Sequence, residues 1–139
     1  MTNRPTVFVA TSKRFYREAE QVVRRLRDIE LTVFHPYFHL DPRDIDADPS
    51  KKSAVTLQHF KEIDRSDLLF ALLPGGYIGH SVTIEITYAY ARMKRLVASH
   101  APDEYAVRSM VDTICGAGEF VAQLQSEWGS NNDQSNRKP

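Results

Sequence analysis

The stretch "LLFALLPGGYIGHSVTIE" (residues 68–85) carries the strongest indication of the fold in this sequence. Its first six residues form the most hydrophobic run of the chain and predict a central strand buried on both faces. A Pro-Gly-Gly turn follows at residues 74–76, and a helix is expected to begin at Ser81 or Thr83 and to end near Met93. A strand, a glycine-containing loop and a helix in this order are typical of a parallel βαβ unit.

The same alternation continues along the rest of the chain. Apolar, β-branched runs predict further strands at residues 6–10, 31–34 and 95–99. Apolar residues at three- and four-residue steps predict helices at residues 15–26, 53–65 and 118–128, the second with Leu57, Phe60 and Ile63 as its apolar side. Residues 105–115 are expected to be helical, with a short edge strand near Thr113.

Strands that alternate with helices imply parallel strands joined by right-handed crossovers. We therefore predict an α/β domain over residues 1–128, with a flavodoxin- or Rossmann-like three-layer sandwich. Its parallel sheet should have about four or five strands in the order 2-1-3-4-5. Residues 129–139 are polar and have no apolar anchor, which predicts a disordered tail.

The composition excludes several classes of protein. The chain has 139 residues, with 18 Lys+Arg against 18 Asp+Glu, so no net charge attracts nucleic acid or an anionic membrane. Its single cysteine, Cys115, rules out an intrachain disulfide or a cysteine zinc site. The polar start "MTNRPT" lacks the apolar core of a signal peptide, and no apolar run approaches the roughly 20 residues of a membrane span. We expect a cytoplasmic protein.

Ligands of open parallel sheets bind beyond the carboxyl ends of the strands. That rule points to three segments, residues 11–14, 35–48 and 74–85. The second is rich in Pro and Asp and has no clear period, and a loop of such length inside a compact domain is often functional.

The first segment stands between a strand and a helix. Its backbone N–H groups, with Ser12, Lys13 and Arg14, could bind a phosphate. It has no glycine, so it is neither a P-loop nor a dinucleotide-binding fingerprint. The alternative is that Thr11 or Ser12 caps an ordinary helix beside two solvated cations.

The third segment ends on one carboxylate, Glu85. Glycines such as Gly76 and Gly79 allow the backbone to approach a ligand closely, because no Cβ intrudes. A carboxylate in the first turns of the following helix can hydrogen-bond a sugar hydroxyl or attack an anomeric carbon. The alternative is a glutamate that only stabilises the positive end of a helix dipole. The spacing from Pro-Gly-Gly to Glu favours the functional interpretation.

Other kinds of site have little support. Six side chains match no metal-binding spacing: His35, His39, His59, Asp41, Asp44 and Asp46. We therefore expect no metal and no cofactor. There is no G-x-S-x-G motif, and the apolar surroundings of the single cysteine predict an unreactive thiol.

Three motifs together resemble the nucleoside 2-deoxyribosyltransferase family, and especially its 2'-deoxynucleoside 5'-phosphate N-hydrolase branch. They are a strand followed by "ATS" and a helix, "DRSDLLFALLPGG" as strand and loop, and "EITYAYARMKRLV". The similarity spans about residues 6–125. It implies cleavage of an N-glycosidic bond in a nucleoside or nucleoside 5'-monophosphate. "LPGG" also resembles, more weakly, the PGGxGTxxE of the phosphoribohydrolases of the lysine-decarboxylase-like family.

The resemblance assigns roles to individual residues. Glu85 matches the family's nucleophile, which attacks C1' of the sugar through a transition state like an oxocarbenium ion. Ser81 lies in the loop that contacts sugar or phosphate, and residues 12–14 fall in the phosphate-binding first loop. Ser109, in "VRSMV", resembles a serine donated by a neighbouring subunit, which implies a homodimer.

The chain also departs from the family at several positions. Phe8, which the resemblance together with Thr11 places among the substrate contacts, stands where the family has an aromatic hydroxyl beside the carboxylate, although Tyr88 could restore one. His59 occupies the place of a second catalytic carboxylate and could act as an acid towards the leaving base. Thr87 follows Glu85 where a small residue is usual. Phe8 and His59 favour an alternative, a nucleotide-sensing module that keeps the pocket without catalysis. A TIR-like NAD hydrolase ranks last.

Overall fold

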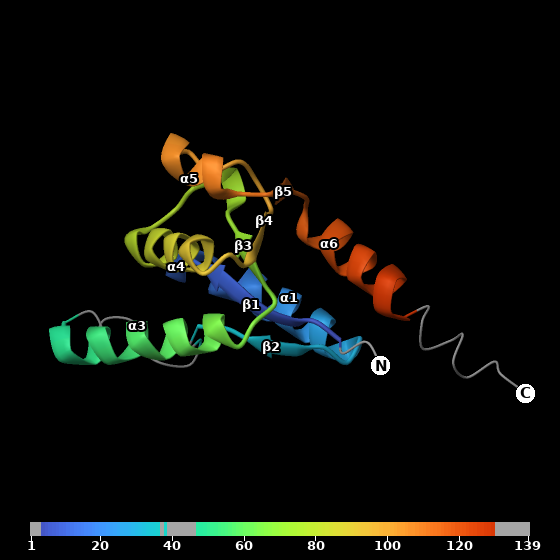
Figure 1. Ribbon diagram of the computed structural model, residues 1–139, viewed down its shortest axis with the longest axis horizontal. Helices are drawn as coiled ribbons and strands as arrows, with labels where there is room; N and C mark the ends of the chain where they lie inside the picture. Colours follow the sequence, from blue (N-terminus) through green and yellow to red (C-terminus); the bar gives the residue numbers. More distant parts are fainter. Residues whose placement is uncertain (1–3, 37, 39–46, 130–139) are drawn as a thin grey trace, which may run out of the picture.

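The computed structural model describes residues 4–36, 38 and 47–129. Its five strands form one parallel sheet in the order β2-β1-β3-β4-β5, which confirms the predicted topology (Figure 1). The strands are β1 (Thr6–Thr11), β2 (Thr32–Phe34), β3 (Leu68–Leu72), β4 (Arg95–Ala98) and β5 (Thr113–Ile114).

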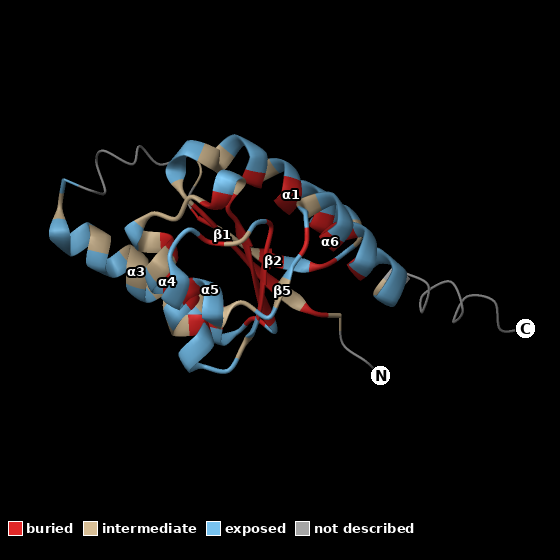
Figure 2. Ribbon diagram, turned by 90° about the horizontal axis from the view of Figure 1, so that it is seen from above, coloured by how far each residue is buried: buried red, intermediate tan, exposed pale blue. Residues whose placement is uncertain are grey.

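Helices cover both faces of this sheet. They are α1 (Tyr16–Asp28), α3 (Pro49–Asp64), α4 (His80–Ala91), α5 (Tyr105–Met110) and α6 (Ala117–Leu124), with short turns η1 (Lys13–Phe15), η2 (Pro74–Gly76) and η3 (Gln125–Gly129). Figure 2 shows α1 and α6 on one side of the buried strands and α3, α4 and α5 on the other. The predicted three-layer sandwich is therefore confirmed.

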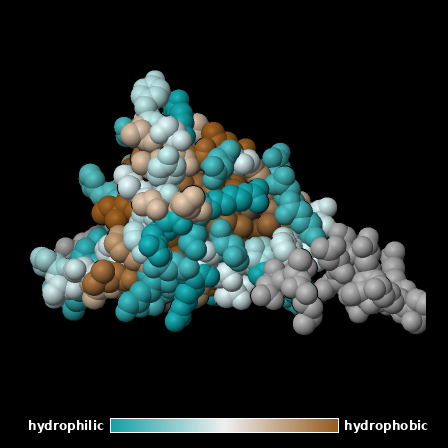
Figure 3. All heavy atoms as spheres, viewed as in Figure 1, coloured by the Kyte–Doolittle hydropathy of each residue, from teal (hydrophilic) through white to brown (hydrophobic). Residues whose placement is uncertain are grey.

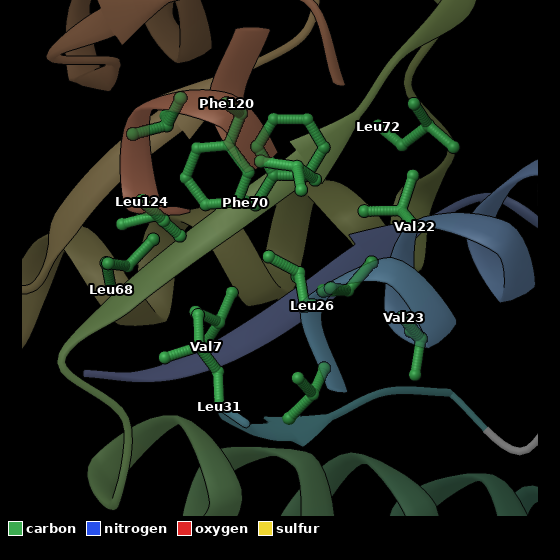
Figure 4. Close-up of a cluster of buried hydrophobic side chains, with 14 of the residues drawn as sticks. Val7, Val22, Val23, Leu26, Leu31, Leu68, Phe70, Leu72, Phe120 and Leu124 are labelled. Carbon is green, nitrogen blue, oxygen red and sulfur yellow. The ribbon is translucent and has the colours of Figure 1, made fainter. Parts of the chain in front are cut away.

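Alternation along the strands divides the core into two clusters. Val7 and Val9 of β1 belong to the cluster under α1 and α6. Figure 4 shows Val7 in this cluster with Phe70 of β3 and Phe120 of α6. Phe8 points the opposite way, into the cluster packed under α3 and α4. The fully apolar β3 is buried on both faces, as a central parallel strand should be.

The register of the central strands places two loops side by side. Thr11 at the end of β1 pairs with Leu72 at the end of β3. The threonine hydroxyl donates a hydrogen bond of 2.9 Å to the Leu72 carbonyl, so it fastens the two strand ends together. The chain that leaves β1 towards α1 therefore lies next to the chain that leaves β3 towards α4.

Helix α3 begins earlier than the sequence pattern predicts. Asp48 caps it by accepting hydrogen bonds from the backbone N–H groups of Ser50, at 2.9 Å, and Lys51, at 3.5 Å. Proline at the first helical position suits this start. The predicted apolar side is also wrong at Leu57, whose side chain is exposed (57%). The buried residues of α3 are His59 and Ile63.

The C-terminal part agrees with prediction in outline. Residues 105–115 form a helix only as far as Met110, and the predicted edge strand is present as β5. Of the predicted tail, residues 130–139 lie outside the described residues, as do residues 37 and 39–46 of the long loop. Figure 3 shows hydrophilic side chains over much of the face in view, with hydrophobic atoms gathered near its centre and left edge.

Candidate functional site

A cavity of about 660 Å³ opens beyond the carboxyl ends of β1 and β3. Its walls come from the β1–α1 connection, one side of α3, and the loop and first turns that begin α4. This is the position where ligands bind in open parallel sheets. The lining residues are Thr11, Ser12, Lys13, Arg14, Tyr16, Pro36, Lys52, Val55, Thr56, His59, Tyr77, Gly79, His80, Ser81, Val82, Ile84 and Glu85.

Glu85 lies at the inner wall of this cavity and is only 4% exposed. It stands three residues after Val82 and four before Ala89, so helical geometry places it on the face of α4 that packs against the sheet. Both neighbours on that face are buried and apolar. A carboxylate in such a place is expensive to desolvate, which makes a purely solvated, surface role for Glu85 impossible.

His59 faces Glu85 from the neighbouring helix. Its Nδ1 lies 3.5 Å from Oε2 of Glu85, and His59 is itself only 9% exposed. Glu85 Oε2 is buried and accepts no hydrogen bond from the part of the chain that the structure describes, so the imidazole is the polar group set against it. The sequence pairs these residues only through the family resemblance, and the structure brings them together.

Phe8 lies behind this pair rather than in the cavity. It is fully buried, and its ring meets the His59 ring edge-on at a centroid distance of 5.5 Å. It does not line the cavity, so the expectation that Phe8 contacts substrate is not met. Alternation along β1 directs Phe8 into the core below α3 and α4, where its ring packs against His59 and does not reach the cavity.

A tyrosine that no sequence motif indicates also lines the cavity. Tyr16, the first residue of α1, lines the wall and is half-buried. Burial, and secondarily the negative charge of Glu85, raise the pKa of Tyr16 to about 12. Its ring packs edge-on against Phe38 at 5.2 Å. A phenol with such a pKa stays protonated at neutral pH and is available as a hydrogen-bond donor.

Tyr88 does not restore a hydroxyl at the site. Its hydroxyl donates a hydrogen bond of 2.8 Å to Asp64 at the surface between α3 and α4, and Arg92 donates to the same carboxylate at 2.9 Å. The bond from Tyr88 is the main reason that the pKa of Asp64 lies below its usual value. This network ties the ends of two helices together, away from the cavity.

Ser12 joins the two loops instead of capping a helix. Its hydroxyl accepts a hydrogen bond of 3.2 Å from the backbone N–H of Gly79, and it makes no capping bond. The expected cap by Thr11 or Ser12 is therefore wrong, because Thr11 bonds to β3. A Cβ at residue 79 would come within 3.1 Å of the Ser12 hydroxyl, so glycine permits this close approach.

The other predicted contacts divide into two groups. Lys13, Arg14 and Ser81 line the cavity, as expected of ligand contacts. Gly76 does not: it is buried beside the segment 101–103 and serves the turn that leaves β3. Ser109 is exposed on α5, where its hydroxyl donates to the carbonyl of Ala106, so it lies outside the cavity of its own chain.

Two further wall residues could have been found from the sequence. Lys52, Thr56 and His59 recur at four- and three-residue steps along α3, so one helix face presents all three to the cavity. Once His59 is considered as a site residue, this spacing nominates Lys52 and Thr56. Tyr77 carries no such signal, because its position depends on the conformation of the glycine turn before it.

Among residues 4–36, 38 and 47–129, no three His, Cys, Asp or Glu side chains gather in a way that could bind a metal ion. Several of the loop residues considered for a metal site, His39 and Asp41 to Asp46 among them, lie outside these residues. Within the same described part of the chain, no helix is both long enough and apolar enough to cross a membrane.

No protein-family model matches the chain, and no curated protein matches its sequence. Solved structures do resemble it. A conserved protein from Enterococcus faecalis V583 aligns with a TM-score of 0.67 at 17% identity, over 90% of this chain and 99% of that one. A 2-deoxyribosyltransferase from Bacillus psychrosaccharolyticus aligns with a TM-score of 0.59 at 18% identity, over 86% and 95% of the two chains.

The Clostridium botulinum CMP N-glycosidase BcmB also aligns, with a TM-score of 0.55 at 18% identity, over 86% of this chain and 98% of that one. These TM-scores establish a common fold, while identities of 17% and 18% do not by themselves transfer an activity. The chain therefore has the α/β fold that a nucleoside 2-deoxyribosyltransferase and a nucleotide N-glycosidase share.

Proposed function

We propose that this protein cleaves the N-glycosidic bond of a nucleoside or nucleoside 5'-monophosphate, as a hydrolase or as a deoxyribosyltransferase. The observation that carries the proposal is the placement of Glu85. Its carboxylate is buried in the wall of a cavity large enough for a nucleotide, at the ligand-binding edge of the sheet, opposite an imidazole at 3.5 Å.

Glu85 acts on the sugar. Its carboxylate attacks C1' as the bond from C1' to the base nitrogen breaks, and the electron pair of that bond leaves with the base. The base takes up a proton, and the sugar is held as an ester of Glu85. Water, or the nitrogen of a second base, then displaces Glu85 from C1'. A buried carboxylate also stabilises the positive charge that develops on the sugar ring, because little water screens it.

His59 has two roles in this proposal, one towards the carboxylate of Glu85 and one towards the departing base. Its contact with Oε2 orients Glu85, and the imidazole can release a proton towards the departing base. Tyr16 lines the same cavity and supplies a phenol there, whose pKa is raised by burial and secondarily by the charge of Glu85. We propose that Tyr16 takes the role of the tyrosine that the family resemblance leads one to expect at position 8. His59 takes the role of the carboxylate expected at position 59.

The cavity suits an anionic substrate. Arg14 lines it beside the basic side chains of Lys13 and Lys52. Ser81 and the first turn of α4 also line it, at the positive end of that helix dipole. A phosphate on the sugar could bind Arg14 and this helix end, which favours a nucleoside 5'-monophosphate over a neutral nucleoside.

We further propose that the enzyme works as a cytoplasmic homodimer. Ser109 is exposed, lies outside its own cavity, and resembles a serine that completes a neighbouring site. Exposed apolar side chains on α3 and α4, Leu57 and Ile84, offer a surface for a second copy beside the cavity mouth.

A second candidate is a nucleotide-sensing module. The observation that favours it is His59 itself, because a protonated imidazole beside Glu85 would reduce the nucleophilicity of the carboxylate. Such a protein would bind a nucleotide in the same cavity without cutting it.

One experiment separates the two. The protein is incubated with nucleosides, nucleoside 5'-monophosphates and NAD, and free base is followed by chromatography, while binding of the same compounds is measured by calorimetry. Base release that disappears in Glu85→Ala supports the enzyme. Tight binding of a monophosphate without base release supports the sensor. Release of nicotinamide from NAD alone would instead favour NAD hydrolysis.

A further inference from the structure

We propose that Tyr77 is a positioning residue that holds the Arg14 guanidinium over the cavity, where it binds the phosphate of the substrate. Tyr77 thereby determines how strongly the site prefers a phosphorylated nucleoside to the nucleoside itself. The inference rests on the proposed function for the identity of the ligand, but its geometry is independent of any cleavage.

The contact between the two side chains is close. The Arg14 Cζ lies 3.7 Å from the centroid of the Tyr77 ring, which is the distance of a guanidinium stacked on an aromatic face. Both residues line the cavity. An arginine stacked in this way keeps its N–H groups directed outward in the plane of the guanidinium, where they can form paired hydrogen bonds with phosphate oxygens.

The ring itself is fixed by its surroundings. Phe15 packs edge-on against it at 6.1 Å. The Tyr77 N–H bonds to the Pro74 carbonyl at 3.3 Å, closing a turn in which Gly75 and Gly76 take positive φ angles of 67° and 82°. The ring is therefore a prearranged support, which reduces the entropy lost when Arg14 binds a ligand.

Arg14 has no competing charge partner in the described part of the chain. No carboxylate there lies within ion-pair distance of it, whereas the surface arginines Arg4 and Arg92 each pair with an acidic residue. A guanidinium that stacks on an aromatic ring at a cavity wall, without an anion of its own, suits an anionic ligand group.

The test uses binding in a Glu85→Gln background, so that no ligand is consumed. Calorimetry measures Kd for a panel of nucleoside 5'-monophosphates, for the matching nucleosides and for inorganic phosphate. Tyr77→Leu should raise the Kd of a bound monophosphate by about fivefold and leave that of its nucleoside unchanged. Tyr77→Phe, which keeps the aromatic face, should retain the original affinity.

A double-mutant cycle shows whether Tyr77 acts through Arg14. Arg14→Gln should weaken monophosphate binding, and adding Tyr77→Leu to it should cause no further loss. The proposal is overturned if Tyr77→Leu weakens nucleoside and monophosphate equally, if its effect persists without Arg14, or if no monophosphate binds. Monophosphate-selective binding without base release by the wild-type protein would refute the proposed function and leave this inference standing.

Discussion

The Nδ1 atom of His59 lies 3.5 Å from Oε2 of Glu85, and the two residues are only 9% and 4% exposed. They come from adjacent helices, α3 and α4, whose packing against the same sheet face creates the contact. The pair joins the one carboxylate among the described lining residues to their one buried imidazole. Stability and activity should both be sensitive to it.

Removal of His59 should destabilise the fold. We expect His59→Ala to lower the free energy of unfolding by about 2–4 kcal/mol, because Glu85 is left buried without the polar group that faces it. Glu85→Gln in the same chain should recover much of that loss, since an amide is less costly to bury than a carboxylate. Urea denaturation of both single variants and the double variant measures the coupling. Simple addition of the two single effects would contradict this account.

Tyr16 should make the fold sensitive to alkali. Its pKa is raised from 10.0 to about 12 in the folded protein, so its contribution to stability is complete below pH 10 and is lost as the pH rises from 10 towards 12. Between about pH 9 and pH 11 the wild-type protein should lose about 1 kcal/mol more than Tyr16→Phe, allowing for partial solvent screening.

The exposed Tyr90 provides a matched control, because Tyr90→Phe removes a hydroxyl outside the cavity. It should show the same alkaline loss as the wild type. Equal pH profiles for Tyr16→Phe and Tyr90→Phe would mean that the environment of Tyr16 does not resist its ionisation.

The two glycines of the turn after β3 should differ in their tolerance of alanine. Both have positive φ angles, but a Cβ on Gly76 would lie 2.6 Å from the Ala101 carbonyl oxygen, while a Cβ on Gly75 meets nothing within 4 Å. Gly76→Ala should therefore cost about 3 kcal/mol and Gly75→Ala only about 1 kcal/mol, the strain of the left-handed conformation. Thermal unfolding of the two variants measures both losses of stability. Equal losses would show that the strain of the positive φ angle, and not the clash with Ala101, determines the cost.

Mixing inactive subunits tests the shared site. If each cavity uses Glu85 of one chain and Ser109 of the partner, Glu85→Gln and Ser109→Ala chains are both impaired alone. A refolded equimolar mixture should regain about a quarter of the wild-type sites, because about half of the dimers are mixed and each has one intact site. Activity equal to the mean of the two separate variants would refute a site shared in this way.

Much of the fold could be predicted because its signals are local. The apolar run of β3 and the turn after it define a buried parallel strand, and the periodic apolar residues of α1 mark its inner face. The start of α3 was missed because Asp48 and Pro49 set it through capping, which overrides the hydrophobic pattern. Leu57 was misplaced because periodicity cannot tell which of two helix faces meets the sheet.

The site was less predictable because it depends on contacts between distant segments. Glu85 could be found from its loop and helix, since both lie next to it in sequence. Tyr16 and Tyr77 could not be found in this way. They meet at the cavity because the loop after β1 lies against the loop after β3, and these two loops are far apart in the sequence. Phe8 lies in the same layer as Glu85 and His59 but does not reach the cavity, because its ring packs in the core against the His59 ring; the resemblance gives the position of Phe8 along the strand and not this depth.

The rate of base release by Glu85→Gln tests the central claim most directly. Glutamine keeps the shape of the side chain and removes its charge, and calorimetry with a bound monophosphate verifies that the cavity is intact. On the best substrate of the panel, we expect single-turnover base release to fall by at least about a thousandfold, since the amide can neither attack C1' nor neutralise the developing cation. Base release within about tenfold of the wild-type rate would contradict the account.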